Sequence, residues 1–159
     1  MQRLGKNTDG YQGEAIEISA VLRECEQASR DHGWRIEHLP AGPELTILAC
    51  TRAANAPANT ERATRRRIYL STGIHGDEPA GPLAALQLLK EDQWPPDVDL
   101  WFCPCLNPTG FPLNRRENAQ GIDLNRQYLH IQAEETRAHL AWLDRQPNFD
   151  LTLCLHEDW

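Results

Sequence analysis

The feature that most constrains the fold of this chain is a strand-like run that ends in a glycine-containing turn and continues directly into a helix-like run. Residues 67–72 are rich in β-branched and aromatic side chains, which favours a buried strand. Gly73 and Gly76 permit a tight turn, and residues 80–90, preceded by Pro79, are predicted to form an apolar helix. Side chains in this turn should lie at the carboxyl end of a strand, where open α/β sheets bind their ligands.

The turn carries His75 and Glu78, a His-x-x-Glu pair that offers two metal ligands from one short loop. A second strand-like run, residues 150–155, ends in His156. Two histidines and one carboxylate leave the fourth position of a tetrahedral zinc open to water, which is typical of catalytic rather than structural sites. The pattern therefore predicts a catalytic zinc centre. Taken alone, the tetrapeptide favours an ordinary loop histidine over a ligand, so the motifs around it have to decide.

Four motifs follow one another between about residue 68 and residue 156. They are His75-x-x-Glu78, Asn107-Pro-x-Gly110, Arg116-x-Asn118-x-x-Gly121-x-Asp123-Leu124-Asn125-Arg126 and His156. In this order they resemble the zinc carboxypeptidase superfamily, which includes the succinylglutamate desuccinylase and aspartoacylase branch. Four ordered motifs are far more specific than any one of them.

The resemblance implies a role for each matching residue. The implied zinc ligands are His75, Glu78 and His156. Arg116 matches the arginine that polarises the scissile carbonyl and stabilises the oxyanion, and a fixed cation at that point lowers the barrier. Asn125 and Arg126 match the pair that binds the terminal carboxylate of the substrate, and a guanidinium can engage a carboxylate through two parallel hydrogen bonds. For any arginine seen alone, a surface salt bridge would be the better interpretation.

Neighbouring polar residues are expected to support this machinery. Asn118 and Asp123 are interpreted as braces for the loop that presents Asn125 and Arg126, because short polar side chains commonly bond to nearby backbone. Arg115 is expected to be solvated. Asp77 and Glu157 flank predicted ligands and are candidate acceptors for the ligating imidazoles.

The predicted fold class is α/β, with a mixed β-sheet flanked by helices in one zinc carboxypeptidase-like domain over residues 1–159. The expected helices are 13–33, 80–90 and 132–144, and the expected strands are 34–39, 44–51, 67–72, 98–103 and 150–155. Residues 53–64 are expected to form a surface loop. On one face of the last helix the sequence places Ala133, Thr136, Leu140 and Leu143.

The resemblance also predicts that the sheet is incomplete at its C-terminus. Superfamily members supply a general-base glutamate from a strand beyond the third ligand, whereas this sequence ends at Trp159. We therefore expect either the front part of a longer enzyme or a chain that binds zinc without turnover. If residues 150–155 have no partner on their far side, they present an open sheet edge.

Composition limits the partners and the compartment. The formal net charge of -7 argues against nucleic acid or an anionic membrane as the main partner. The first residues lack the apolar core of a signal peptide, so a cytoplasmic location is expected. Five cysteines, an odd number, favour reduced thiols over a disulfide framework, and the Cys103-Pro-Cys105 pair is interpreted as structural.

These features predict a zinc-dependent hydrolase of an amide bond next to a free carboxylate, of the metallocarboxypeptidase or cell-wall peptide amidase type. The expected substrate is a peptide or acyl-amino acid with an exposed acid group. Two alternatives stay open. One is an aspartoacylase-like or succinylglutamate desuccinylase-like deacylase, which shares the ligands and the Asp123-Leu-Asn-Arg126 segment. The other is a non-catalytic domain that binds zinc and carboxylates.

Overall fold

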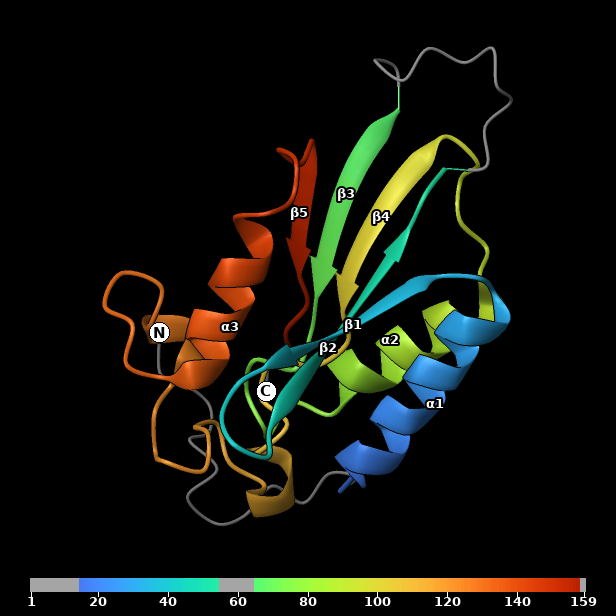
Figure 1. Ribbon diagram of the computed structural model, residues 1–159. Coiled ribbons are helices and arrows are strands. Elements are labelled where there is room, and N and C mark those ends of the chain that lie inside the picture. The colour runs from blue at the N-terminus through green and yellow to red at the C-terminus, as the bar shows by residue number, and fades with distance from the viewer. Residues whose placement is uncertain (1–14, 55–64, 158–159) are drawn as a thin grey trace, which may run out of the picture.

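The computed structural model describes residues 15–54 and 65–157 (Figure 1). They form a five-stranded sheet in the order β1-β2-β4-β3-β5. The helices and strands are, in chain order, α1 (Ile18–Asp31), β1 (Arg35–Pro40), β2 (Thr46–Arg52), β3 (Arg66–Ser71), α2 (Ala80–Glu91), β4 (Val98–Cys103), α3 (Glu134–Leu143) and β5 (Leu151–Cys154). Each helix and strand predicted from sequence exists, with ends that differ by a few residues. The predicted start of the first helix and most of the predicted loop lie outside the described residues.

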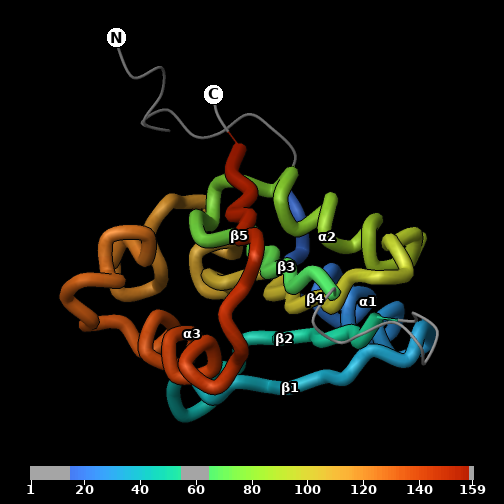
Figure 2. The backbone as a smooth tube through the Cα atoms, turned by 90° about the horizontal axis from the view of Figure 1, so that it is seen from above, coloured from blue at the N-terminus to red at the C-terminus, as the bar shows by residue number. Residues whose placement is uncertain are grey.

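The sheet is mixed, as expected. β1 pairs with β2 and β2 with β4 in antiparallel fashion, whereas β3 runs parallel to both β4 and β5. Figure 2 shows α1 and α2 on one side of the sheet and α3 on the other. Strand side chains alternate accordingly: Leu70 belongs to the core under α1 and α2, and its neighbour Tyr69 belongs to the core under α3.

The predicted face of α3 is only partly the buried one. Ala133 and Thr136 are buried as expected, whereas Leu140 and Leu143 are half-buried. The polar residues Glu135 and His139 are buried in their place. Burial of these two side chains is tolerated because each has hydrogen-bond partners from other segments, which sequence periodicity cannot reveal.

Strand β5 lies at the edge of the sheet and, among the described residues, pairs with β3 alone. All four of its residues are exposed, and its two leucines, Leu151 and Leu153, are 45% and 38% exposed. This is the open edge that the sequence analysis anticipated for a strand without a partner on its far side.

The cysteines are free thiols, as the odd count predicted. Cys103 and Cys105 are completely buried, and burial raises the pKa of both thiols, which suits a packing role. Cys154 is exposed on β5. In the described part of the chain, no helix has the length and apolar character needed to cross a membrane.

Candidate metal centre

The three predicted ligands converge at one point. His75 Nδ1 lies 2.6 Å from Glu78 Oε1, and His156 Nδ1 lies 3.0 Å from Glu78 Oε2. One donor atom from each of the three residues lies within 4.8 Å of the others, and the two imidazole centroids are 4.9 Å apart. Both histidines thus present the same ring nitrogen to opposite oxygens of one carboxylate.

Parallel pairing of β3 with β5 brings the ligands together. Ser71 pairs with Cys154 at the carboxyl ends of these strands, and the Leu155 amide still donates to the Ser71 carbonyl beyond the ladder. Both segments therefore leave the sheet at the same edge, one toward His75 and the other toward His156. The positions of the ligands follow from the general rule that open α/β sheets bind at the carboxyl ends of their strands.

Glycine is required where the ligand turn meets the loop after β4. A Cβ on Gly76 would lie 2.2 Å from the carbonyl carbon of Gly110, a distance that no side chain can occupy. The Asn107 side-chain amide, which is fully buried, donates to the carbonyls of Ile74 and Arg116. The ligand turn and the arginine-bearing loop are therefore held together as one packed unit.

The burial of the ligands leaves the centre open on one side. His75 is 2% exposed and Glu78 5% exposed, whereas the side chain of His156 is 34% exposed. Burial opposes ionisation of Glu78, but the hydrogen bond from His75 and the charges of both imidazoles outweigh it, so the pKa of Glu78 is lowered. An ionised carboxylate with two imidazoles and an open side fits the donor set of a zinc ion with a free coordination position.

Asp123 connects a ligand to the arginine. Its Oδ1 lies 3.5 Å from His75 Nε2, an atom that has no hydrogen-bond partner among the described residues, and its Oδ2 accepts from Arg116 Nε at 2.9 Å. Burial opposes ionisation of Asp123, but the Arg116 hydrogen bond and charge lower its pKa. Asp123 also accepts from the Asn125 amide, as the predicted brace should. Sequence analysis missed its place beside the imidazole, where a carboxylate is positioned to accept a hydrogen bond from a metal-bound histidine.

Asn118 is placed as the sequence predicted, whereas Arg115 is not. Asn118 braces its loop by accepting from the backbone amides of Gln120 and Ile122. Arg115 was expected to be solvated, but it donates to the carbonyls of Asn118 and Ala119 at 2.7 and 2.9 Å. It therefore braces the same loop.

Asp77 and Glu157 were candidate acceptors for the imidazoles. The Glu157 carboxylate accepts from the Ala80 amide at the start of α2, and the Glu157 amide donates to Glu78 Oε2. Asp77 Oδ1 is buried without a hydrogen-bond partner in the described residues. Burial and the charge of Glu78 raise the pKa of Asp77.

Asn125 and Arg126 lie on a short 3₁₀ helix, Leu124–Arg126, which Asp123 caps. Asn125 is half-buried and Arg126 is exposed. Because the capping residue itself approaches His75, this helix starts beside the ligand cluster.

Two functional-looking residues, Glu135 and His139, had no sequence signal of burial. They are four residues apart on α3 and so share one face of the helix, and a glutamate in a helix is usually exposed. Asn118 donates to both oxygens of Glu135, and the hydroxyls of Tyr69 and Tyr128 lie 2.6 and 2.8 Å from the two ring nitrogens of His139.

Known proteins are similar to this chain in sequence and in fold. Carboxypeptidase SOL1 of Arabidopsis thaliana is 34% identical over 104 residues, a match that covers 52% of this chain and 21% of that protein. A candidate metallopeptidase from Shewanella denitrificans OS217 superimposes with a TM-score of 0.73 at 26% identity, over 93% of this chain and 57% of the other. A metallo-carboxypeptidase from Pseudomonas aeruginosa gives a TM-score of 0.65 at 25% identity, over 86% and 38%.

The mixed sheet, the ligand cluster at its edge and these likenesses define a protein of the zinc carboxypeptidase-like superfamily. Within it, residues 27–141 match the family described as "Protein of unknown function (DUF2817)". Because this match spans well over half of the sequence, the chain belongs to that family. The chain spans about a fifth of the length of the Arabidopsis relative and little more than half of the Shewanella structure.

Proposed function

We propose that this chain carries the metal centre of a zinc-dependent hydrolase that cleaves an amide bond next to a free carboxylate. The observation that carries the proposal is the convergence of His75, Glu78 and His156 on one point that is buried on one side and open on the other. A zinc ion bound there would supply Lewis-acid activation of water and of the scissile carbonyl. The carboxypeptidase names of the relatives support the same class of reaction.

The residues of this chain would hold and polarise the substrate. Asp123 would hold the His75 imidazole with its Nε2 protonated, which leaves Nδ1 free to ligate. Arg116, fixed by Asp123, would place a guanidinium charge beside the carbonyl oxygen as negative charge develops on it. This side chain is 37% exposed, so its guanidinium is accessible to substrate.

We further propose that Asn125 and Arg126 bind the substrate carboxylate. They lie two and three residues after Asp123, on the short helix that starts beside the ligand cluster, so a carboxylate held there would lie near the metal. The Pseudomonas aeruginosa metallo-carboxypeptidase was solved with (2-guanidinoethylmercapto)succinic acid, a dicarboxylic acid. A peptide with a free C-terminus fits this arrangement, and the peptidase names of the relatives favour it over an acyl-amino acid.

A direct test measures zinc content and hydrolysis in the same preparation. Metal-free protein is reloaded with zinc, and its activity is compared on a peptide with a free C-terminal carboxylate, the same peptide amidated, and an N-acyl-aspartate. The expected result is one zinc per chain and hydrolysis of the free-acid peptide alone. Faster cleavage of the N-acyl-aspartate would indicate the deacylase alternative instead.

Arg116→Ala should lower kcat/KM by about 100-fold or more, the usual cost of removing one oxyanion donor. Arg137→Ala is the matched control, because Arg137 is an exposed arginine that pairs with Glu134. A front part of a longer enzyme would lack its general base, so these assays use the protein at the length found in its source cells. Zinc binding and carboxylate binding with no turnover of any of these substrates at that length would contradict the hydrolase proposal and favour the non-catalytic alternative.

A further inference from the structure

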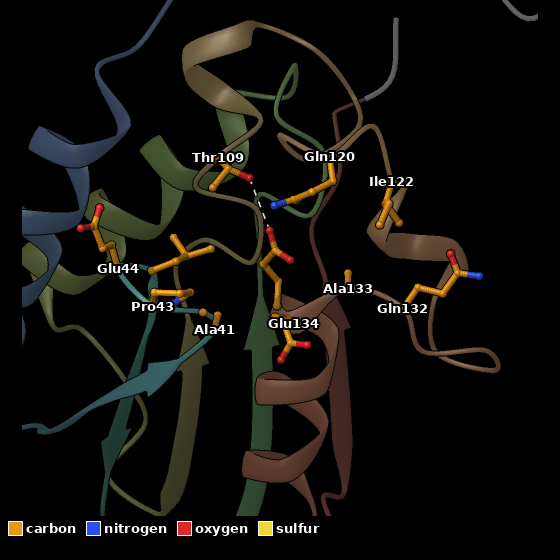
Figure 3. A pocket seen from close by; sticks show the side chains of 12 residues that line it. Ala41, Pro43, Glu44, Thr109, Gln120, Ile122, Gln132, Ala133 and Glu134 are labelled. Atoms are coloured by element: carbon orange, nitrogen blue, oxygen red, sulfur yellow. Dashed lines mark hydrogen bonds between the residues drawn. The ribbon is translucent and has the colours of Figure 1, made fainter.

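A pocket of about 440 Å³ lies between the turn that joins β1 to β2, the loop after β4 and the start of α3 (Figure 3). None of the metal ligands lines it. Its lining includes three glutamates, Glu44, Glu134 and Glu135, and no lysine or arginine. The volume falls within the range of roughly 300 to 1,000 Å³ that is usual for small-molecule sites.

Glu135 is the buried member of this acidic lining, with 3% exposure. Its two oxygens share the Asn118 side-chain amide, at 3.1 and 3.2 Å, and Oε1 has a longer contact of 3.4 Å from the Thr109 hydroxyl. A carboxylate offers about four acceptor positions, so the pocket side of Glu135 retains room for another donor. In Figure 3 the side chains of Thr109 and Gln120 point toward each other at this end of the pocket.

The charge of Glu135 has no cationic partner among the described residues, whereas its neighbour Glu134 pairs with Arg137 at 3.4 Å. Buried carboxylates are normally paired, because an isolated charge is costly to desolvate. The N-terminus of α3 contributes only about half a positive charge. With Glu44 also on the lining, the pocket therefore keeps a negative excess.

The rest of the lining is largely apolar, with Ala41, Leu45 and Ile122 among its residues. A ligand that matches both the negative charge and the apolar lining of the pocket has one positive group and a short hydrocarbon chain. We propose that this pocket binds a primary ammonium group on a short apolar chain, with Glu135 as its anionic partner. The site is separate from the metal centre, so the proposal does not depend on the proposed hydrolase activity.

The test is a titration of the ¹⁵N-labelled chain with n-butylammonium chloride, in EDTA and at constant ionic strength, followed by amide chemical shifts. We expect saturable shifts at Thr109, Gln120 and Glu135, and no comparable binding of n-butanol, the neutral analogue. Glu135→Gln should weaken binding at least tenfold. Glu91→Gln, which changes an exposed glutamate on α2, should leave it unchanged. N-acetyl-lysine methylamide is titrated in the same way, because it carries the ammonium group of a lysine within a peptide. Binding of this compound as tight as that of butylammonium would indicate a peptide lysine as the ligand, and weaker binding would indicate a free amine.

Equal binding of butanol and butylammonium would overturn the proposal, as would shifts that do not saturate. An unchanged affinity in Glu135→Gln would overturn it as well. If that variant does not fold, Glu44→Gln decides the matter together with the butanol comparison. Glu44 is exposed, so its substitution should not affect folding, and it should weaken butylammonium binding several-fold.

Discussion

Strands β3 and β5 each lead to a histidine of the same cluster, yet they lie in very different surroundings. β3 pairs with a strand on both sides, and its last residues are buried. β5 lies at the edge, and all its residues are exposed. The packed core therefore fixes His75 and Glu78, whereas His156 is held mainly by one strand pairing and by its contact with Glu78. Metal binding should stabilise the β5 side more than the β3 side.

The largest expected effect is loss of the metal. His75→Ala removes a buried ligand. Loss of a residue that only supports a ligand lowers metal affinity by about 10- to 100-fold, so loss of the ligand itself should lower zinc affinity by more than about 100-fold. Equilibrium dialysis with zinc measures this. His130→Ala is the control, because His130 is exposed and lies outside the cluster. If the His75 variant retained zinc, His75 would not be a ligand and the proposed metal centre would be wrong.

Truncation of one leucine in each strand tests the contrast in packing. Leu70→Ala in β3 removes a side chain that is 5% exposed, so the free energy of unfolding should fall by about 2 to 5 kcal/mol. Leu153→Ala in β5, where the leucine is 38% exposed, should cost less than about 1 kcal/mol. Urea denaturation of the metal-free protein gives both values. Similar losses in the two variants would break the comparison.

Acid should weaken the β3 side through His139. Burial lowers the pKa of His139 to about 4, and its two ring nitrogens lie against the hydroxyls of Tyr69, in β3, and Tyr128. The unfolded chain takes up this proton near pH 6.5, so the contribution is fully present above that pH and is lost as the pH falls toward 4. The free energy of unfolding should drop by about 2 kcal/mol between pH 6.5 and pH 5 from this group.

Urea titrations of the wild type and of His139→Gln at several pH values isolate this contribution. The variant keeps a polar side chain but does not titrate, so its stability should depend less steeply on pH across this interval. If the free energies of unfolding of the two proteins depend on pH in the same way, the pKa of His139 is the same in the folded and the unfolded chain and the prediction is wrong.

Of the two changes that act on zinc binding, the smaller effect is expected at Asp123. Asp123→Ala removes the carboxylate beside His75 Nε2 and frees Arg116, so zinc affinity should fall by about 10- to 100-fold. Asp144→Ala, at the exposed end of α3, is the control. An unchanged zinc affinity would show that burial alone orients the His75 imidazole.

Much of the fold was predictable because its signals are local. The strand before His75 and the helix after Glu78 follow from β-branched residues, glycines and a proline in one short stretch. The face of α3 was not predictable, because Glu135 and His139 are buried by partners that lie far away in the sequence. The placement of Arg115 failed for a similar reason, since its acceptors are backbone carbonyls that only the folded loop presents.

The sequence by itself determined the order of strands and helices, the ligand types and the turn in which Gly76 allows two loops to touch, since each depends on local chain chemistry. Tertiary structure decided which side chains meet. Parallel pairing of β3 and β5 brings His156 to Glu78 across 78 residues, and loop packing brings Asp123 to His75. Contacts of this kind depend on how distant segments pack against one another, and no local pattern records that.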